Sequence, residues 1–260
     1  TDECPNLPAN FMPSTYAAEA LTLEHASSPR YHDTYTYTQD DWRRYLYAYY
    51  RLVERVDREV GRIVGVLKAR GLYDDSAIIF LSDHGDGVAA HGWNQKWNLQ
   101  EEVVNVPLIV KAPEGAGLRG VRNDEALSNV GLDLYATVCD YAGVAPDPGR
   151  YRGRSLRPVA EGRQTTLHDE VFVETLLPGP GMRGWCVVGP RYKYVLYQWG
   201  RNREALYDLQ DDPGEMVNLA VDRRYEAELN RLRRAMYDWG VRIGDPKLVR
   251  NLRPWAEPRN

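Results

Sequence analysis

Residues 78–86 read Ile-Ile-Phe-Leu-Ser-Asp-His-Gly-Asp, and this stretch decides the fold that the sequence predicts. Four consecutive apolar residues that end abruptly at Asp83 and His84 indicate a short buried strand of an α/β sheet. In such sheets the carboxyl ends of the strands face the ligand-binding crevice. Asp83 offers a hard anionic oxygen and His84 a neutral imidazole, so we expect the two to bind one divalent cation. A strand-to-loop turn with a solvated Asp83 is the alternative that this stretch alone leaves open.

The residues on either side of this stretch predict an alternation of helix and strand. Thr38-Gln-Asp-Asp41 resembles a capping box, and the apolar residues after it keep helical spacing as far as Gly71. Residues 106–111 read Val-Pro-Leu-Ile-Val-Lys, which predicts a second apolar strand, and a helix follows over 131–142. Such alternation is typical of doubly wound sheets. We therefore expect residues 38–150 to form part of a mostly parallel, helix-flanked α/β sheet.

The pattern changes after residue 150. Short apolar runs with hairpin spacing predict a small antiparallel sheet, with strands at 171–174, 185–188 and 192–197. A helix from about 223 to 240 has an apolar stripe that would cover this sheet. We expect residues 151–260 to form a small α+β subdomain that ends in a surface tail from Asp245. Residues 1–37 are rich in proline and predict an irregular, extended segment.

Composition excludes several classes of protein. The 260 residues are 43% hydrophobic, which is enough to bury a sizeable core. The net charge of −4 does not indicate a nucleic-acid-binding protein. The sequence has no run of about 18 apolar residues, so we expect no membrane span. Cys4, Cys139 and Cys186 have no paired spacing, which argues against a disulfide framework or a structural zinc site.

Taken in order, the motifs of residues 40–220 resemble those of the formylglycine-dependent sulfatases of the alkaline phosphatase superfamily. The matching motifs share that family's sequence and order; they are Ser82-Asp-His-Gly85, Lys96, Val106-Pro-Leu108, Asp133-Leu-Tyr-Ala-Thr137, Gly153-Arg-Ser-Leu156 and the C-terminal run from Leu206 to Leu219. The resemblance implies an alkaline phosphatase-like fold and hydrolysis of a sulfate ester, with a sulfated carbohydrate or a related sulfate ester as the expected substrate. It also implies a periplasmic or secreted bacterial protein.

The resemblance gives roles to single residues. Asp83 and His84 would bind the metal, for which the family implies Ca²⁺, and the His ligand leaves Mn²⁺ open. Lys96 would face a sulfate oxygen or the ester oxygen, where negative charge grows as the S–O bond breaks. His91, whose imidazole titrates near neutrality, would protonate the leaving group or contact the substrate, with a loop-capping histidine as the alternative. Asp86 is expected beside the site rather than as a ligand.

One departure from the family pattern is large. Such sulfatases begin with a half that holds further Asp ligands and the nucleophile motif Cys/Ser-x-Pro-x-Arg, and this motif does not occur in the 260 residues. The sequence therefore resembles a C-terminal half, whose partner would be the N-terminal half with its formylglycine, and we expect this chain alone to be inactive. Arg183 and Glu174, expected in loops, are candidate substrate-binding residues. A phosphonate monoester or phosphodiester hydrolase on the same scaffold, and a non-catalytic C-terminal fragment, remain alternatives.

Overall fold

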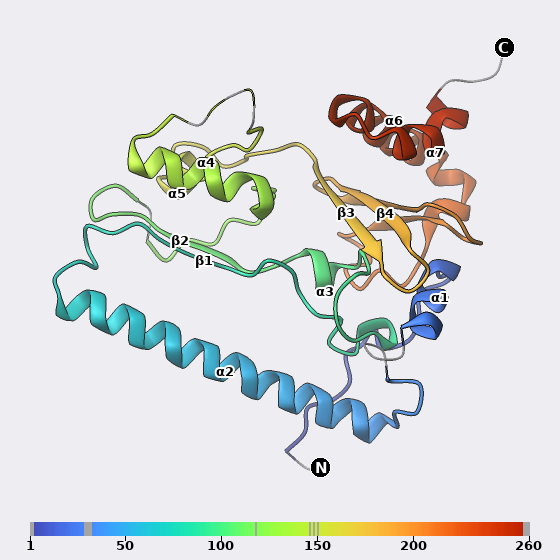
Figure 1. Ribbon diagram of the computed structural model, residues 1–260, viewed down its shortest axis with the longest axis horizontal. Helices are drawn as coiled ribbons and strands as arrows, with labels where there is room; N and C mark the ends of the chain where they lie inside the picture. Colours follow the sequence, from blue (N-terminus) through green and yellow to red (C-terminus); the bar gives the residue numbers. More distant parts are fainter. Residues whose placement is uncertain are drawn as a thin grey trace. The chain divides into compact units, whose positions relative to one another are not determined.

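The computed structural model describes residues 3–28, 33–117, 119–145, 147, 149 and 151–256. The chain forms two compact units that interleave along the sequence (Figure 1). The first unit contains Thr1–Pro5, Arg43–Asp83 and Val106–Val171, and the second contains Asn6–Trp42, His84–Asn105 and Phe172–Asn260. These units differ from the contiguous segments 1–37, 38–150 and 151–260 expected from the sequence, because residues from the middle of the chain pack in the second unit.

Helix α2 (Gln39–Ala69) is the long helix that the apolar spacing predicts, and Figure 1 shows it as one continuous helix. The predicted capping box is present at its start. The amide of Asp41 donates to Thr38 Oγ1 over 3.2 Å, and the amide of Thr38 donates to the Asp41 carboxylate over 3.0 Å. These bonds satisfy amide groups that the first helical turn leaves without partners. Five aliphatic side chains on the helix are each more than half exposed: Leu52, Val53, Val56, Ile63 and Val66.

Strand β1 (Ile78–Leu81) confirms the strand predicted at the opening stretch, but its pairing differs from our expectation. β1 pairs with β2 (Leu108–Lys111) in an antiparallel register that runs from Ile78 opposite Lys111 to Leu81 opposite Leu108. We predicted that this region belongs to a mostly parallel sheet. A parallel neighbour needs a crossover, usually a helix. The connection from β1 to β2 contains only the 3-10 turn Ala90–Gly92 and the four-residue helix α3 (Glu101–Val104), so the chain returns in the opposite direction.

Helix α4 (Val130–Ala142) ends at Gly143 in the left-handed conformation, as the sequence predicts. Its fully buried residue Asp133 organises the rest of the first unit. The carboxylate of Asp133 accepts hydrogen bonds from the amides of Asn129 and Arg154 at 2.7 and 2.8 Å, and His168 Nε2 lies 3.0 Å from it. The two sequence motifs that contain Asp133 and Arg154 thus contact each other through this hydrogen bond. The short helix α5 (Arg157–Ala160) follows.

The second unit is built on an antiparallel sheet of order β3-β4-β5-β6. The strands are β3 (Val171–Leu177), β4 (Met182–Val188), β5 (Tyr192–Tyr197) and β6 (Glu204–Asp208). The predicted hairpin joins β4 to β5, whereas β6 was not predicted as a strand. Helix α6 (Glu226–Ile243) confirms the predicted covering helix, and it packs Leu229, Leu232 and Met236 into one core with Trp185 and Tyr194. Cys139 and Cys186 are buried, and both are free, in line with their unpaired spacing.

Two terminal segments differ from the prediction. Helix α1 (Glu19–Ser27) lies within the segment expected to be extended, since a run of good helix formers follows the first prolines. Helix α7 (Pro246–Ala256) replaces most of the expected surface tail. Its first residue is a proline, a position where proline is well tolerated, and Asp245 accepts from the amides of Lys247 and Leu248. Residues 29–32 of the first segment and 257–260 of the tail lie outside the described residues.

Candidate active site

The segment after β1 carries the residues that the sequence selected. At Asp83 the chain leaves the first unit, and at His84 it enters the second. Asp83 is exposed, and His84 and Lys96 are half-buried. Asp83 and His84 are consecutive residues, and Ser82 separates them from the end of β1 at Leu81.

His84 and Lys96 meet within the second unit. Lys96 Nζ lies 3.1 Å from His84 Nε2, and His84 Nδ1 lies 2.8 Å from the carbonyl oxygen of Gly85. A carbonyl can only accept, so we assign the ring proton to Nδ1. This tautomer leaves the Nε2 lone pair free to accept from the ammonium of Lys96. It is also the tautomer that a metal-binding histidine adopts when its other nitrogen donates to the backbone.

Several residues of the loop that carries His84 and Lys96 have strained backbone conformations. Five non-glycine residues between 88 and 97 have positive φ angles: Val88, Ala89, His91, Gln95 and Trp97. Such conformations persist where the surroundings enforce them, and they cluster at functional sites. The surroundings are close, because a Cβ added to Gly85 would lie 1.9 Å from the carbonyl oxygen of Glu102. Only a glycine fits at that position without moving the loop.

Asp86 has a structural role inside this loop. Its two carboxylate oxygens accept from the amides of Val88 at 2.9 Å and Gln95 at 3.1 Å. The residue after Lys96 is tied down as well, since Thr175 Oγ1 in β3 donates to the carbonyl of Trp97 over 2.8 Å. Both contacts restrain the backbone on either side of Lys96. Asp86 thus lies in the loop that carries Lys96, and its role beside the site stays a prediction.

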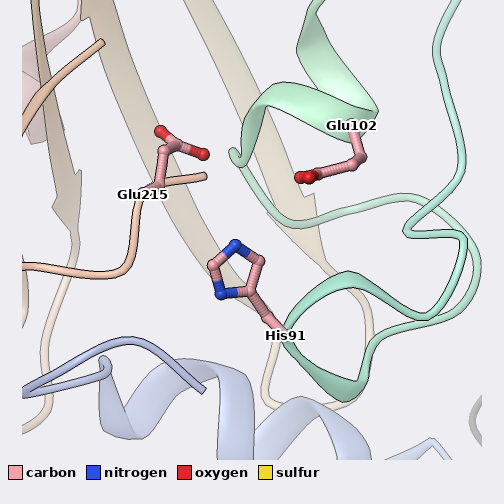
Figure 2. Close-up of side chains that lie close together, drawn as sticks. All are labelled: His91, Glu102 and Glu215. Atoms are coloured by element: carbon pink, nitrogen blue, oxygen red, sulfur yellow. The ribbon is translucent and has the colours of Figure 1, made fainter. Parts of the chain in front are cut away.

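The side chain of His91 has other neighbours than those of His84 and Lys96. Its side chain points toward Glu102 and Glu215 (Figure 2), and only 8% of the residue is exposed. Burial lowers the pKa of His91, and the negative charge of Glu102 opposes that shift. A buried imidazole beside two glutamates is poorly placed to meet a leaving group. The leaving-group role stays a prediction, and these surroundings do not support it.

The sequence did not identify Lys193 as an important residue. Lys193 is fully buried in β5, and its Nζ lies 2.9 Å from Glu101 Oε1 and 2.9 Å from Glu215 Oε1. Burial alone would lower the pKa of Lys193, but the attraction of Glu215 and Glu101 outweighs it and raises that pKa. Burial raises the pKa of Glu215 to about 7, against the attraction of Lys193. The sequence feature that could have identified Lys193 is a single lysine within an otherwise apolar and aromatic strand.

Arg183 and Glu174 lie in strands rather than in the loops that we expected. Glu174 is in β3 and Arg183 in β4, and Arg183 Nη1 lies 2.8 Å from Glu174 Oε1 and 3.5 Å from Asp245 Oδ2. Burial raises the pKa of Glu174, and the charge of Arg183 opposes this shift. Because the arginine and the glutamate neutralise each other, a substrate would have to break their pair. Their substrate-binding role therefore stays a prediction.

Comparisons with known proteins place the chain in a family. The family model described as N-sulphoglucosamine sulphohydrolase, C-terminal, matches residues 89–241, and the sulfatase model matches residues 20–144. A Delta 4,5-hexuronate-2-O-sulfatase of Bacteroides thetaiotaomicron is 32% identical over 98% of this chain and 53% of its own length. A solved 2-O GAG sulfatase superposes with a TM-score of 0.86 at 30% identity, covering 94% of this chain and 54% of its own. A phosphonate monoester hydrolase of Agrobacterium radiobacter gives 0.66 at 25% identity, with 96% and 51% covered.

Fold and motifs together define an α/β protein of the alkaline phosphatase superfamily, with a C-terminal antiparallel sheet covered by helices. Within that superfamily the chain belongs to the sulfatase family. The resemblance noted from the sequence is thereby confirmed. The chain spans about half the length of the curated relatives it matches most fully. Among the helices of the described residues, we find none with the length and apolar character needed to cross a membrane.

Proposed function

We propose that this chain is part of a sulfuric ester hydrolase that acts on a sulfated carbohydrate. The observation that carries the proposal is the pair formed by His84 and Lys96, 3.1 Å apart on a strained loop after β1. One side chain is an imidazole, a common metal ligand, and the other carries a positive charge. Sulfate transfer needs both, because negative charge must be stabilised on the sulfate oxygens and on the departing ester oxygen.

Lys96 is the residue that we assign to transition-state stabilisation. Its ammonium is held by the backbone contacts of its loop and by the uncharged Nε2 of His84, and no carboxylate lies within ion-pairing distance among the described residues. Its positive charge therefore remains available to a sulfate oxygen. A fixed cation that is already oriented needs little reorganisation as the S–O bond breaks.

Asp83 and His84 are the residues that we assign to the metal. The imidazole of His84 and the exposed carboxylate of Asp83 suit a divalent cation, for which we propose Ca²⁺ on family grounds, while the imidazole donor also suits Mn²⁺. Because Nε2 has a single lone pair, metal binding there would move the ammonium of Lys96 from Nε2 to a sulfate oxygen. When bound, such an ion neutralises sulfate oxygens and polarises the nucleophile. Two ligands are fewer than the six to eight that Ca²⁺ takes, so other ligands must come from elsewhere.

We assign those ligands and a formylglycine nucleophile to an N-terminal half that this chain would meet in the whole protein. The relatives extend well beyond the part that this chain matches. Helix α2 also carries Val53, Val56 and Ile63 with 51–63% of each residue exposed. A monomeric soluble protein rarely leaves such residues together on one helix without a covering partner. Both facts support an N-terminal half as the partner.

For the substrate we propose a sulfated sugar. The relatives' names refer to a hexuronate 2-O-sulfate and to an N-acetylglucosamine 6-O-sulfate. On the same grounds we propose a periplasmic or secreted location. Phosphonate monoester hydrolysis is the second candidate, because two phosphonate monoester hydrolases share this fold with TM-scores of 0.67 and 0.66. Phosphoryl and sulfuryl transfer need similar clamps of metal and cation.

The test compares substrates on the intact protein. Turnover of an aryl sulfate, an aryl phosphonate monoester and 2-O- and 6-O-sulfated disaccharides should be measured side by side, with Lys96→Ala as the inactive reference. We expect the highest kcat/KM for a sulfated sugar and no turnover by the 260-residue chain alone. A preference for the phosphonate ester would select the second candidate. Robust aryl sulfate turnover by the 260 residues alone would refute the assignment of the nucleophile to another segment.

A further inference from the structure

A cluster in the second unit that contains two buried residues and the half-buried Glu102 is not used by the proposed chemistry. His91, Glu102 and Glu215 each offer a ligand atom, and these atoms lie within 4.8 Å of one another. Figure 2 shows the ring of His91 pointing between the two carboxylates. Glu215 is fully buried, and His91 is 8% exposed. Among the described residues, neither ring nitrogen of His91 has a hydrogen-bond partner of normal geometry.

The charges around this cluster do not balance. Glu101, Glu102 and Glu215 carry three carboxyl groups, and among the described residues Lys193 is the ammonium that pairs with two of them. Lys193 contacts Glu101 and Glu215, whereas the hydrogen bond recorded for Glu102 comes from the neutral amide of Asn10, at 2.7 Å. Burying a carboxylate without a compensating charge is costly. The cluster therefore favours the uptake of a cation.

We propose that His91, Glu102 and Glu215 bind a divalent transition-metal ion, Zn²⁺ or Mn²⁺. One imidazole nitrogen and two carboxylate oxygens form the mixed donor set that these ions accept, whereas Ca²⁺ prefers oxygen alone. Ligand atoms about 2.1 Å from one ion lie at most about 4.2 Å apart, so small side-chain movements would close the cluster around an ion. A water molecule would complete a four-coordinate shell.

The neighbouring contacts leave room for such an ion. Glu215 Oε2 accepts from the amide of Glu101 over 2.7 Å, and Oε1 faces Lys193. Each carboxylate oxygen has two lone pairs, so Glu215 keeps acceptor capacity beyond these two contacts. Lys193 lowers the cluster's negative charge but does not cancel it. Because burial raises the pKa of Glu215 to about 7, this carboxyl group is partly protonated at neutral pH, and an arriving cation would displace that proton.

Bound in this way, the ion would cross-link separate parts of the second unit. His91 lies in the loop that also carries Lys96, Glu102 lies in α3, and Glu215 lies in the turn after β6. The amide of His91 also donates to the carbonyl of Asn10 over 2.6 Å, which brings the N-terminal segment to the same place. The metal would therefore brace the Lys96 loop against the C-terminal sheet without touching the substrate.

Metal binding by the full 260-residue chain tests the proposal. The chain is stripped with EDTA, then titrated with ZnCl₂ and MnCl₂ in a calorimeter, and the bound ion is counted by elemental analysis. We expect one Zn²⁺ or Mn²⁺ per chain with a micromolar or lower Kd, and a higher Tm in the loaded protein. Glu102→Gln keeps an acceptor for Asn10, and His91→Asn places a residue that tolerates positive φ. Each should weaken binding at least tenfold.

Asp83→Asn is the matched control, because it removes a carboxylate from the other candidate metal site. It should leave this affinity within about twofold. Circular dichroism and urea unfolding check that the variants fold. If His91→Asn fails to fold, the conservative variant Glu102→Gln still tests the proposal. The proposal is overturned if the wild-type chain binds no stoichiometric Zn²⁺ or Mn²⁺. It is also overturned if Glu102→Gln binds like wild type, or if Asp83→Asn alone abolishes binding. None of these results depends on sulfatase activity.

Discussion

Replacing Lys193 with methionine should destabilise the second unit strongly. The side chain of Lys193 is fully buried, and its Nζ lies 2.9 Å from both Glu101 Oε1 and Glu215 Oε1. Methionine fills a similar volume but removes the charge, so Glu215, whose side chain is 1% exposed, would stay buried without its cation. Removing one partner of a buried ion pair costs about 3–5 kcal/mol. For a chain of this size that corresponds to a fall in Tm of roughly 6–20 °C.

The assay is urea unfolding followed by circular dichroism in the presence of EDTA, with Tm measured alongside. Lys68→Met, an exposed lysine on α2, is the control and should change the free energy of unfolding by no more than about 0.5 kcal/mol. The double variant Lys193→Met with Glu215→Gln should recover part of the loss, with a coupling energy of about 1–3 kcal/mol. A loss below about 1 kcal/mol for Lys193→Met, or no recovery in the double variant, would refute the reasoning.

Three further predictions concern the loop and the sheet. In the intact protein, Lys96→Ala should lower kcat for sulfate esters by about 10²–10³ while moving the free energy of unfolding by about 0.5 kcal/mol at most; steady-state kinetics and urea unfolding check both values. Gly85→Ala should displace the loop, because its Cβ would lie 1.9 Å from the Glu102 carbonyl, and a fall in both Tm and kcat is expected. Hydrogen bonds from Arg191 hold the pKa of Asp208 below its usual value of 3.8. That stabilisation is present above 3.8 and lost as pH falls through the lowered pKa, so Arg191→Gln should lower Tm at pH 7, and the difference should vanish in strong acid.

Local patterns predicted the elements whose partners are close in sequence. Apolar spacing and a capping box were sufficient for α2, and the four apolar residues before Ser82 were sufficient for β1. Pairing direction was not predictable in the same way, because β1 and β2 carry similar apolar runs whether they lie parallel or antiparallel. The prolines near the C-terminus were misleading, since Pro246 begins α7 rather than interrupting it.

At the candidate site, too, local sequence predicted the contacts between nearby residues but not those between distant ones. The sequence placed His84 and Lys96 in one motif, and the structure brings their side chains to 3.1 Å. It could not show that His91, five residues before Lys96, turns to Glu215. That contact depends on how a turn more than a hundred residues later packs in the second unit, and no local pattern encodes it. Lys193 was overlooked for the same reason, because its carboxylate partners lie 92 and 22 residues away along the chain.

The interleaving of the two units has a consequence for synthesis on the ribosome. The loop that carries Lys96 is restrained by contacts with Thr175, Lys193 and Glu215, and the bond between Glu101 and Glu215 spans 114 residues. At about 5–20 residues per second, translation needs roughly 6–23 s to supply the last of these partners after the loop has been made. During that interval the loop with Lys96 and His84 has its local contacts, such as those of Asp86 with the amides of Val88 and Gln95, but lacks its contacts with later residues. A message truncated before the codon for Glu215 would therefore yield a chain that contains both residues but lacks the contact between Glu215 and the amide of Glu101.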